Sequence, residues 1–506
     1  MKTMLLTILS ILLAVSCGPE PQPQPEHVSL SADKTTLEFT AEGGEQTVVV
    51  TTSEKLYIVT GETWLKAKQG TKSADHKIEV TFTATANEAT AERTARVSLV
   101  AGEEKTYLDV TQAAAEKKDE PGGEDPIVPD NNGNVAWQML EKFGLGWNLG
   151  NQMDAYNNSV SAETAWGNPK ATQATFDKVK GAGFTTVRIP VTWMGHIGEA
   201  PEYKIEEAWL NRVAELVGYA ENAGLNAVVN MHHDDKEWLS VKSAALNSEK
   251  HAQLLEQIGA MWTQIAEKFK DKGDFLVFEA FNEVHDGNWG WGDNQKDGGK
   301  QYQCLNEWNQ TFVDAVRATG GNNATRILGI PAYCTNVDIA VENFVMPEDV
   351  VEGRLMMSVH SYDPYDYALA ATKSEWGHTA EAAKKVSGDN ELQIRTMFEK
   401  IYVNFIAKGI PVYMGEFGCV NRATAREQAF QQYYLKYYTK AAKTYGVPCF
   451  IWDNGAKGAG NECHAFFDHA TGEYCSDGAS AAMRAMVSAY KSSYTLEDIY
   501  NQAPTF

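Results

Sequence analysis

The sequence predicts a closed (β/α)₈ TIM barrel, an α/β fold, preceded by a small all-β, immunoglobulin-like sandwich. Two observations predict the barrel. Eight short apolar runs alternate with stretches of helical periodicity after residue 135, and nearly every run ends in polar or aromatic residues. The sandwich is predicted by short β-branched runs at regular spacing between residues 28 and 115. A chain of 506 residues also exceeds what one hydrophobic core usually supports, so at least two domains are expected.

The first residues have the features of a secretory signal. Lys2 precedes an apolar stretch from Met4 to Val15 that is too short to span a bilayer, and a polar, proline-rich segment follows. The tetrapeptide AVSC at 14–17 resembles the lipobox of bacterial lipoproteins, in which the cysteine is lipidated. We therefore expect a lipoprotein signal peptide at 1–16, a lipid anchor on Cys17 and a Pro/Gln spacer at 17–27. The mature chain would be an outer-membrane lipoprotein on the cell surface or the periplasmic face.

Charge and cysteine content limit the possible partners. The net charge of −23 argues against nucleic acid, whose binding requires clusters of Lys and Arg. Outside the cytoplasm the remaining cysteines could form disulfides, but their spacing assigns no pairing. They lie at positions 304, 334, 419, 449, 463 and 475.

Residues 28–115 predict an antiparallel sandwich from the runs VSLSA, TLEFTA, QTVVVTT, KIEVTFTA, RVSLVA and TYLDVTQ. The order FTAEGGEQTVVVTT, GETWLKAKQG and ATANEATAERTARVSLV resembles the BACON domain, whose name suggests carbohydrate binding. The alternative is a spacer between the anchor and an enzyme. Only Tyr57 and Trp64 could stack on a sugar, and Trp64 is expected in the core. A charged linker rich in Pro and Gly follows at 116–134.

The eight barrel strands are expected within residues 135–506. An open, doubly wound sheet is the alternative, but no Gly-rich phosphate-binding turn follows the first run. The runs are GLGWNLGN (144–151), TTVRIPV (185–191), NAVVNMHH (226–233), FLVFEAFNE (275–283), RILGIPAY (326–333), LMMSVHSY (355–362), PVYMGEFG (411–418) and PCFIWDNG (448–455).

Polar and aromatic residues stand at the carboxyl ends of these runs. In a barrel such ends gather on one face, where the sites of barrel enzymes are built. The residues at the ends are Asn151, Arg188, His232, His233, Asn282, Glu283, His360, Tyr362, Glu416 and Trp452.

Two glutamates share the run VFEAFNE, but their spacing argues against a catalytic pair. Glu279 and Glu283 lie about 13 Å apart along a strand at roughly 3.3 Å per residue. Retaining glycosidases hold their two carboxyl groups about 5–5.5 Å apart. We therefore expect Glu279 to lie inside the barrel beside an internal donor, and Glu416 to be the partner of Glu283 across the barrel mouth.

The motifs GWNLGN, ETAWGNP, VRIPVTW, NMHHDD, AFNE, SVHSYDPYDYA, GEFG and IWDNG, in this order, resemble glycoside hydrolase family 5, and most of all its cellulases and xyloglucanases. The resemblance implies that Glu283 is the general acid/base and Glu416 the nucleophile of a retaining endo-β-1,4-glucanase. One alternative is a xyloglucan-specific member of the same family. A non-catalytic surface glycan-binding protein is an alternative of another class.

The same resemblance and simple chemistry assign supporting roles. Arg188 would lower the pKa of Glu416, Tyr362 would donate a hydrogen bond to it, and the charge of Glu416 would raise the pKa of Glu283. Asn282 would bind the sugar 2-hydroxyl.

Other positions are expected to bind sugar. His232 and His360 match family positions around the same sugar, with Trp452 as its stacking floor and Asn151 beside a neighbouring sugar. His233 is a lesser candidate. Cleft wall and loop packing are both open for Trp166, Trp289 and Trp291. The Gly-rich loop HDGNWGWGDNQKDGG at 285–299, which follows the fourth run, is expected to form a glucan platform.

No metal and no cofactor are predicted. Adjacent residues on a strand point to opposite faces, so His232 and His233 of the MHHDD segment are not expected to bind one ion. Neither a His-Xaa-His nor a His-Glu-Xaa-Xaa-His pattern occurs in the chain. We expect a monomer whose partners are a β-glucan and, through Cys17, a membrane.

Overall fold

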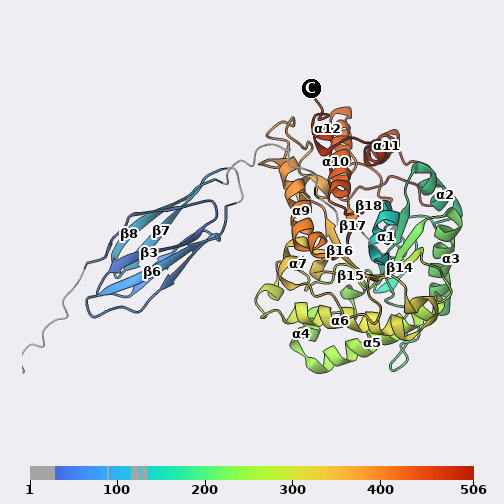
Figure 1. Cartoon of the computed structure of the whole chain (residues 1–506), viewed down its shortest axis with the longest axis horizontal. Coiled ribbons are helices and arrows are strands. Elements are labelled where there is room, and N and C mark those ends of the chain that lie inside the picture. The colour runs from blue at the N-terminus through green and yellow to red at the C-terminus, as the bar shows by residue number, and fades with distance from the viewer. Residues whose placement is uncertain (1–28, 88–90, 115–125, 127–133) are drawn as a thin grey trace, which may run out of the picture. The chain divides into compact units, whose positions relative to one another are not determined.

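The computed structural model describes residues 29–87, 91–114, 126 and 134–506 (Figure 1). The chain divides into two units, Met1–Gly122 and Gly123–Phe506. The predicted signal peptide, Cys17 and the Pro/Gln spacer lie outside the described residues, as does most of the predicted linker. Within the described ranges, no helix is long and apolar enough to cross a membrane.

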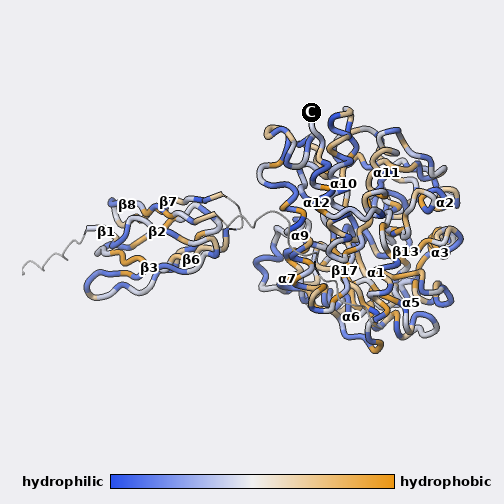
Figure 2. Tube along the Cα trace, turned by 45° about the horizontal axis from the view of Figure 1, so that its top comes forward, coloured by the Kyte–Doolittle hydropathy of each residue, from blue (hydrophilic) through white to orange (hydrophobic). Residues whose placement is uncertain are grey.

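The first unit is a sandwich of two four-stranded sheets, ordered β1-β3-β6-β5 and β2-β8-β7-β4. Buried and exposed residues alternate along β6, as expected for strands with one face toward a core, and hydropathy alternates with them (Figure 2). The strands are β1 (Ser31–Ala32), β2 (Thr36–Phe39), β3 (Gly44–Thr51), β4 (Leu56–Val59), β5 (Leu65–Gln69), β6 (Lys77–Ala84), β7 (Arg93–Ala101) and β8 (Glu104–Gln112).

The predicted sandwich is confirmed, with two differences of detail. Strand β2 pairs parallel with β8, so the sandwich is not purely antiparallel. Strands β4 and β5 lie outside the six predicted runs, because their exposed positions interrupt the β-branched pattern. Trp64 packs against the sandwich core, as expected, with the Arg93 guanidinium 4.5 Å from its ring centroid, whereas Tyr57 is exposed.

The second unit is a closed, all-parallel barrel in the order β12-β13-β14-β15-β16-β17-β18-β9, which confirms the predicted (β/α)₈ fold. Almost every strand residue is buried, because side chains inside the barrel and the helices outside cover both faces. The strands are β9 (Leu145–Leu149), β12 (Thr186–Ile189), β13 (Asn226–Val229), β14 (Leu276–Glu279), β15 (Leu328–Pro331), β16 (Leu355–Ser361), β17 (Val412–Phe417) and β18 (Cys449–Asp453).

Helices surround the ring of strands (Figure 1). Most of them begin at a residue whose side chain caps the helix; α10, for example, starts with a capping box between Thr424 and Glu427. The helices are α1 (Val135–Phe143), α2 (Gln173–Ala182), α3 (Glu207–Ala223), α4 (Val241–Leu246), α5 (Ser248–Lys268), α6 (Lys300–Ala318), α7 (Val337–Asn343), α8 (Tyr365–Ala368), α9 (Asn390–Asn404), α10 (Ala425–Thr444), α11 (Asp477–Lys491) and α12 (Leu496–Tyr500).

Short elements decorate the loops between strands and helices. They comprise the hairpin β10 (Tyr156–Asn157) and β11 (Val160–Ser161), and the 3₁₀ turns η1 (Asp234–Lys236), η2 (Asp293–Gln295), η3 (Gly321–Ala324), η4 (Tyr333–Thr335) and η5 (Ile406–Lys408). Because all eight barrel strands run parallel, the loops that follow them meet at one face.

Candidate active site

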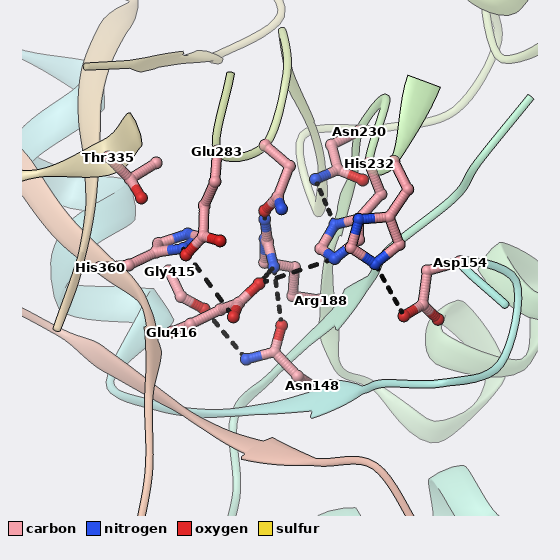
Figure 3. Close-up of polar contacts among 12 residues, drawn as sticks. Asn148, Asp154, Arg188, Asn230, His232, Glu283, Thr335, His360, Gly415 and Glu416 are labelled. Atoms are coloured by element: carbon pink, nitrogen blue, oxygen red, sulfur yellow. Dashed lines mark hydrogen bonds and ion pairs between the residues drawn. The ribbon is translucent and has the colours of Figure 1, made fainter. Parts of the chain in front are cut away.

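Arg188, on β12, is the centre of the polar cluster at the carboxyl ends of the strands (Figure 3). Its guanidinium is fully buried and donates to two carboxylates: Nε and Nη2 to Glu279 at 3.0 and 2.7 Å, and Nη1 to Glu416 at 2.6 Å. The other bonds go to the amide oxygens of Asn148, at 3.1 Å, and Asn282, at 2.8 Å. A buried cation is costly without such partners, and here it is fully bonded.

Glu279 lies inside the barrel beside internal donors, as predicted. Besides Arg188, the hydroxyl of Tyr413 donates to its Oε2 at 2.8 Å. Burial raises the pKa of Glu279, but the Arg188 cation and these hydrogen bonds outweigh it and lower the pKa below its ordinary value. Glu279 is therefore a fixed negative charge that compensates Arg188.

Glu283 and Glu416 meet across the barrel mouth. Carboxylate oxygens of the two residues and a nitrogen of His360 all lie within 4.8 Å of one another, and Figure 3 shows Glu283 and Glu416 close together. Glu416 accepts the Tyr362 hydroxyl at 2.8 Å in addition to Arg188, whereas His360 Nδ1 lies 2.8 Å from Glu283 Oε1. Carboxylate oxygens this close fit the arrangement of retaining glycosidases, whose carboxyl groups lie about 5–5.5 Å apart.

Burial dominates the titration of both acids. It raises the pKa of Glu283 to about 7, against the opposing charge of Arg188. It also raises the pKa of Glu416, although His360, Arg188 and a phenol hydroxyl lower it. Arg188 lowers the pKa of Glu416, as expected, but removing the carboxylate from water outweighs the nearby cation, so the net shift is upward. Likewise, burial is the main cause of the raised pKa of Glu283.

The proton of the pair still belongs on Glu283. Glu416 has a guanidinium and a hydroxyl bonded to its two oxygens, and both favour the ionised form. The neighbour of Glu283 is His360, whose pKa burial lowers to about 4, so this imidazole is neutral. The arrangement is one charged and one protonated acid, side by side.

His232 and His233 lie together, contrary to expectation. Strand β13 ends at Val229, so the alternation of a strand no longer applies and the two rings stand 4.4 Å apart. Together with Asp154 they offer three atoms within 4.8 Å of one another. However, Asp154 already accepts two backbone N–H groups, and the Asn230 amide can only donate to His232 Nδ1, at 3.2 Å. These bonds occupy lone pairs that a metal would need.

Trp452 and Asn151 flank this histidine pair. The Trp452 indole is parallel to the His232 ring, with an angle of 4° and centroids 5.9 Å apart. It is seated against Gly150, where an added Cβ would come within 2.7 Å of the indole. Asn151 adopts a left-handed φ of 54°, held by its N–H donation to Asp154 at 3.0 Å. The absence of a side chain at Gly150 thus leaves room for the indole to lie parallel to the His232 ring.

Comparison with known proteins agrees with this geometry. The profile Cellulase (glycosyl hydrolase family 5) matches residues 150–458, and the BACON profile matches residues 57–113. The chain belongs to glycoside hydrolase family 5. The xyloglucan-specific endo-beta-1,4-glucanase of Bacteroides ovatus is 33% identical over 456 residues, which cover 86% of this chain and 87% of that protein. Endoglucanase A of Paenibacillus barcinonensis is 38% identical over 339 residues, 64% of this chain and 84% of that protein.

Solved structures of family 5 enzymes resemble the barrel unit of this chain. A native Bacteroidetes-affiliated GH5 cellulase linked with a polysaccharide utilization locus has a TM-score of 0.72 and 46% identity, covering 74% of this chain and 99% of that one. A GH5-4 broad specificity endoglucanase from Bacteroides salanitronis has a TM-score of 0.69 and 54% identity, covering 73% and 98%. The family resemblance and the N-terminal BACON resemblance are both confirmed.

Three exposed tryptophans of this family 5 hydrolase lie outside the central cluster. Trp166 is 41% exposed, and its ring centroid lies 5.7 Å from that of His233. Trp289 is 56% exposed and lies 4.4 Å from the ring of His285. Trp291 is 80% exposed. The first two therefore touch side chains that follow the site strands β13 and β14.

Sequence reasoning missed several polar residues that hold the family 5 site. Asn148 and Tyr413 lie within apolar strands, where a single polar residue was not distinguished from ordinary core. Asn148 Nδ2 donates to the Gly415 carbonyl at 2.9 Å, next to Glu416. Asp154 lies in a loop with no strand pattern to mark it. The usable signal was a polar residue inside an otherwise apolar strand, the same signal that revealed Glu279.

Proposed function

We propose that this protein is a retaining endo-β-1,4-glucanase in which Glu416 is the nucleophile and Glu283 the general acid/base. The observation that carries this proposal is the pair of carboxyl groups with oxygens within 4.8 Å, one bonded to a buried guanidinium and a phenol hydroxyl, the other with a pKa of about 7. Membership of the cellulase family supports the reaction class.

In the first step, the Glu416 carboxylate attacks the anomeric carbon while the glycosidic C–O bond breaks and Glu283 gives its proton to the leaving oxygen. Glu416 is then a neutral ester. The Glu283 charge raises the pKa of Glu416. Repulsion between two like charges acts on both groups, so loss of the Glu416 charge should lower the pKa of Glu283. Glu283 can then take a proton from water, which attacks the anomeric carbon and releases Glu416. The anomeric configuration is retained overall.

Residues around the pair bind the reacting sugar. The Asn282 carbonyl accepts from Arg188, so its amide N–H groups are the ones that can bond the 2-hydroxyl. Trp452 forms the floor, with His232 beside it and His360 holding Glu283.

The substrate class is a β-1,4-linked glucan, either cellulose-type, mixed-linkage or a xyloglucan backbone. The names of the endoglucanase relatives support this broader substrate class. Xyloglucan specificity is the second candidate, favoured by the Bacteroides ovatus relative, whose match covers 86% of this chain. A non-catalytic glycan-binding role is disfavoured by the acid pair.

The location is part of the proposal. A lipid anchor on Cys17 would hold a monomeric enzyme at the outer membrane, and the lipobox-like AVSC segment supports it. Metabolic labelling with a palmitate analogue tests this: wild type should carry the label, and Cys17→Ala should not.

The acid roles are tested by comparing two substrates. Glu283→Ala should hydrolyse an aryl cellobioside with an activated leaving group far better than β-glucan, because such a leaving group needs no proton. Glu416→Ala should lose both activities. Glu279→Asp keeps the buried charge and is the control for general damage to the barrel mouth. Equal losses on both substrates in the two catalytic variants would contradict the assignment, as would NMR detection of the inverted anomer first.

A further inference from the structure

The loop that follows β14 has a defined conformation. Asp286 accepts the backbone N–H of Asn288 at 3.2 Å and that of Asn294 at 3.1 Å. Asn294 is buried and donates to the Gly290 carbonyl at 3.2 Å and to the Tyr302 hydroxyl at 2.9 Å. These bonds tie residues 286–294 to one another and to α6. These bonds therefore fix the backbone of the loop that carries Trp289.

Trp289 lies within this loop and has an unusual backbone conformation. Its φ is 50°, in the left-handed region, which is rare for a bulky residue and costs free energy. Such residues persist where the surroundings hold them, and they cluster at functional sites. Trp289 nevertheless keeps more than half of its surface open, so its conformation does not serve to bury the indole.

Two side chains hold the indole. The His285 ring lies 4.4 Å away at 32°, and Lys236 Nζ lies 5.5 Å from the indole centroid. Lys236 is itself fixed by Asp235 at 2.7 Å and approaches His285 Nε2 at 3.5 Å. The indole is thus anchored through the residues that follow β13 and β14, and the remainder of its surface is free for a ligand.

The Trp289 ring lies on the side of Glu283, the proposed acid, and not on the side of Glu416, the proposed nucleophile. His285 follows Glu283 by two positions in the chain, and the Lys236 charge acts on the Glu283 carboxyl group. On the side of Glu416, His232 Nε2 lies 3.9 Å from Glu416 Oε1, and the Trp452 indole is parallel to the His232 ring. In the proposed reaction Glu283 protonates the oxygen of the leaving sugar, so that sugar must lie next to Glu283.

We propose that Trp289 is the stacking platform for the leaving part of the glucan, positioned by Lys236 and His285. The apolar C–H face of a glucose ring would lie on the open face of the indole. This inference rests on the proposed roles of Glu283 and Glu416, and nothing in it depends on which β-glucan is preferred.

The test separates the two halves of the reaction with 2-deoxy-2-fluoro-β-cellobiosyl fluoride. Glu416 forms a bond to C1 and fluoride leaves, so trapping needs neither a leaving sugar nor an acid. The trapped enzyme is released by cellobiose, whose hydroxyl attacks C1 while the ester bond to Glu416 breaks and the hydroxyl proton passes to Glu283. Cellobiose must occupy the leaving-sugar position for this step.

For Trp289→Ala we expect trapping at the wild-type rate and slow release by water as in wild type, but release by cellobiose reduced roughly tenfold, the size of a lost aromatic contact. Trp289→Phe should recover most of the release, which controls for damage to the loop. Trp291→Ala, a more exposed tryptophan in the same loop, should match wild type in all three rates.

If cellobiose releases Trp289→Ala at the wild-type rate, the proposed role of Trp289 is wrong. It is also wrong if trapping of Trp289→Ala is slow, because the indole would then contact the trapped sugar. If wild type is not labelled at Glu416, as mass spectrometry of its peptides would show, the proposed function fails instead. The two failures are therefore distinguishable.

Discussion

Replacing Glu279 with Gln tests the reasoning about the buried charges most directly. The substitution keeps the shape of the side chain but removes one of the two carboxylates that compensate Arg188. Both members of the Arg188–Glu279 ion pair are fully buried, and removing one partner of a buried ion pair costs about 3–5 kcal/mol of folding stability. Arg188 still keeps its bond to Glu416 at 2.6 Å, so we expect a loss at the lower end of this range, about 3 kcal/mol of unfolding free energy.

The same change should slow the first chemical step. Without Glu279, the carboxylate of Glu416 is the only anion bonded to Arg188, so it is held more tightly and attacks less readily. Forming the ester then removes that last bonded anion. A penalty of about 3 kcal/mol corresponds to about a hundredfold lower kcat/KM on β-glucan.

Urea denaturation and initial rates measure these two effects. The pKa of Glu279 is lowered in the folded protein, so its stabilisation is present above the ordinary value of 4.5 and is lost as pH falls through the folded pKa. The difference in unfolding free energy between wild type and Glu279→Gln should therefore be largest at pH 7 and become smaller at acid pH. A variant with wild-type stability and kcat/KM at pH 7 would refute the account of Arg188. Tyr413→Phe, which removes a single hydrogen bond to Glu279, should show a smaller loss.

Three further predictions follow from single contacts. The proposed acid Glu283 must carry a proton, and its pKa is about 7, so kcat/KM should fall above about pH 7. The charge of Lys236 lowers the pKa of Glu283, so Lys236→Met should move this alkaline limb of the pH–rate profile to higher pH. Tyr362→Phe removes the bond of 2.8 Å to the proposed nucleophile and should raise its pKa, which moves the acid limb of the pH–rate profile upward; an unshifted limb would contradict this role. Gly150→Ala places a Cβ within 2.7 Å of the Trp452 indole, so KM for cello-oligosaccharides should rise severalfold while unfolding remains cooperative by circular dichroism.

The strand pattern predicted the centre of the site well. The rise per residue separated Glu279 from Glu283, and the structure places Glu279 against Arg188 in the barrel interior. The ends of parallel strands must share one face, so Glu283 and Glu416 could be brought together without knowing any contact. What pattern cannot supply is the balance of burial against charge, which decided the pKa of Glu416.

The loops were less predictable because their geometry depends on individual turns. His232 and His233 were treated as strand residues, but β13 ends at Val229, before them, and a 3₁₀ turn (Asp234–Lys236) follows directly. Nothing in the sequence indicated that Asp154, in another loop, would lie 4.0 Å from His233. Trp289 could be noticed in the sequence, yet the left-handed backbone and the contacts that hold it could not be inferred from composition.

The buried cluster also explains how one site can hold so many ionisable groups through a two-step reaction. In the resting enzyme Arg188 is positive, Glu279 and Glu416 are negative, and Glu283 is neutral. In the proposed ester intermediate Glu416 would be neutral and Glu283 negative. The net charge of the four side chains is the same in both states, so the desolvation cost is not paid anew at either step. Glu279 makes this possible, because it keeps Arg188 bonded to an anion when the charge of Glu416 is consumed.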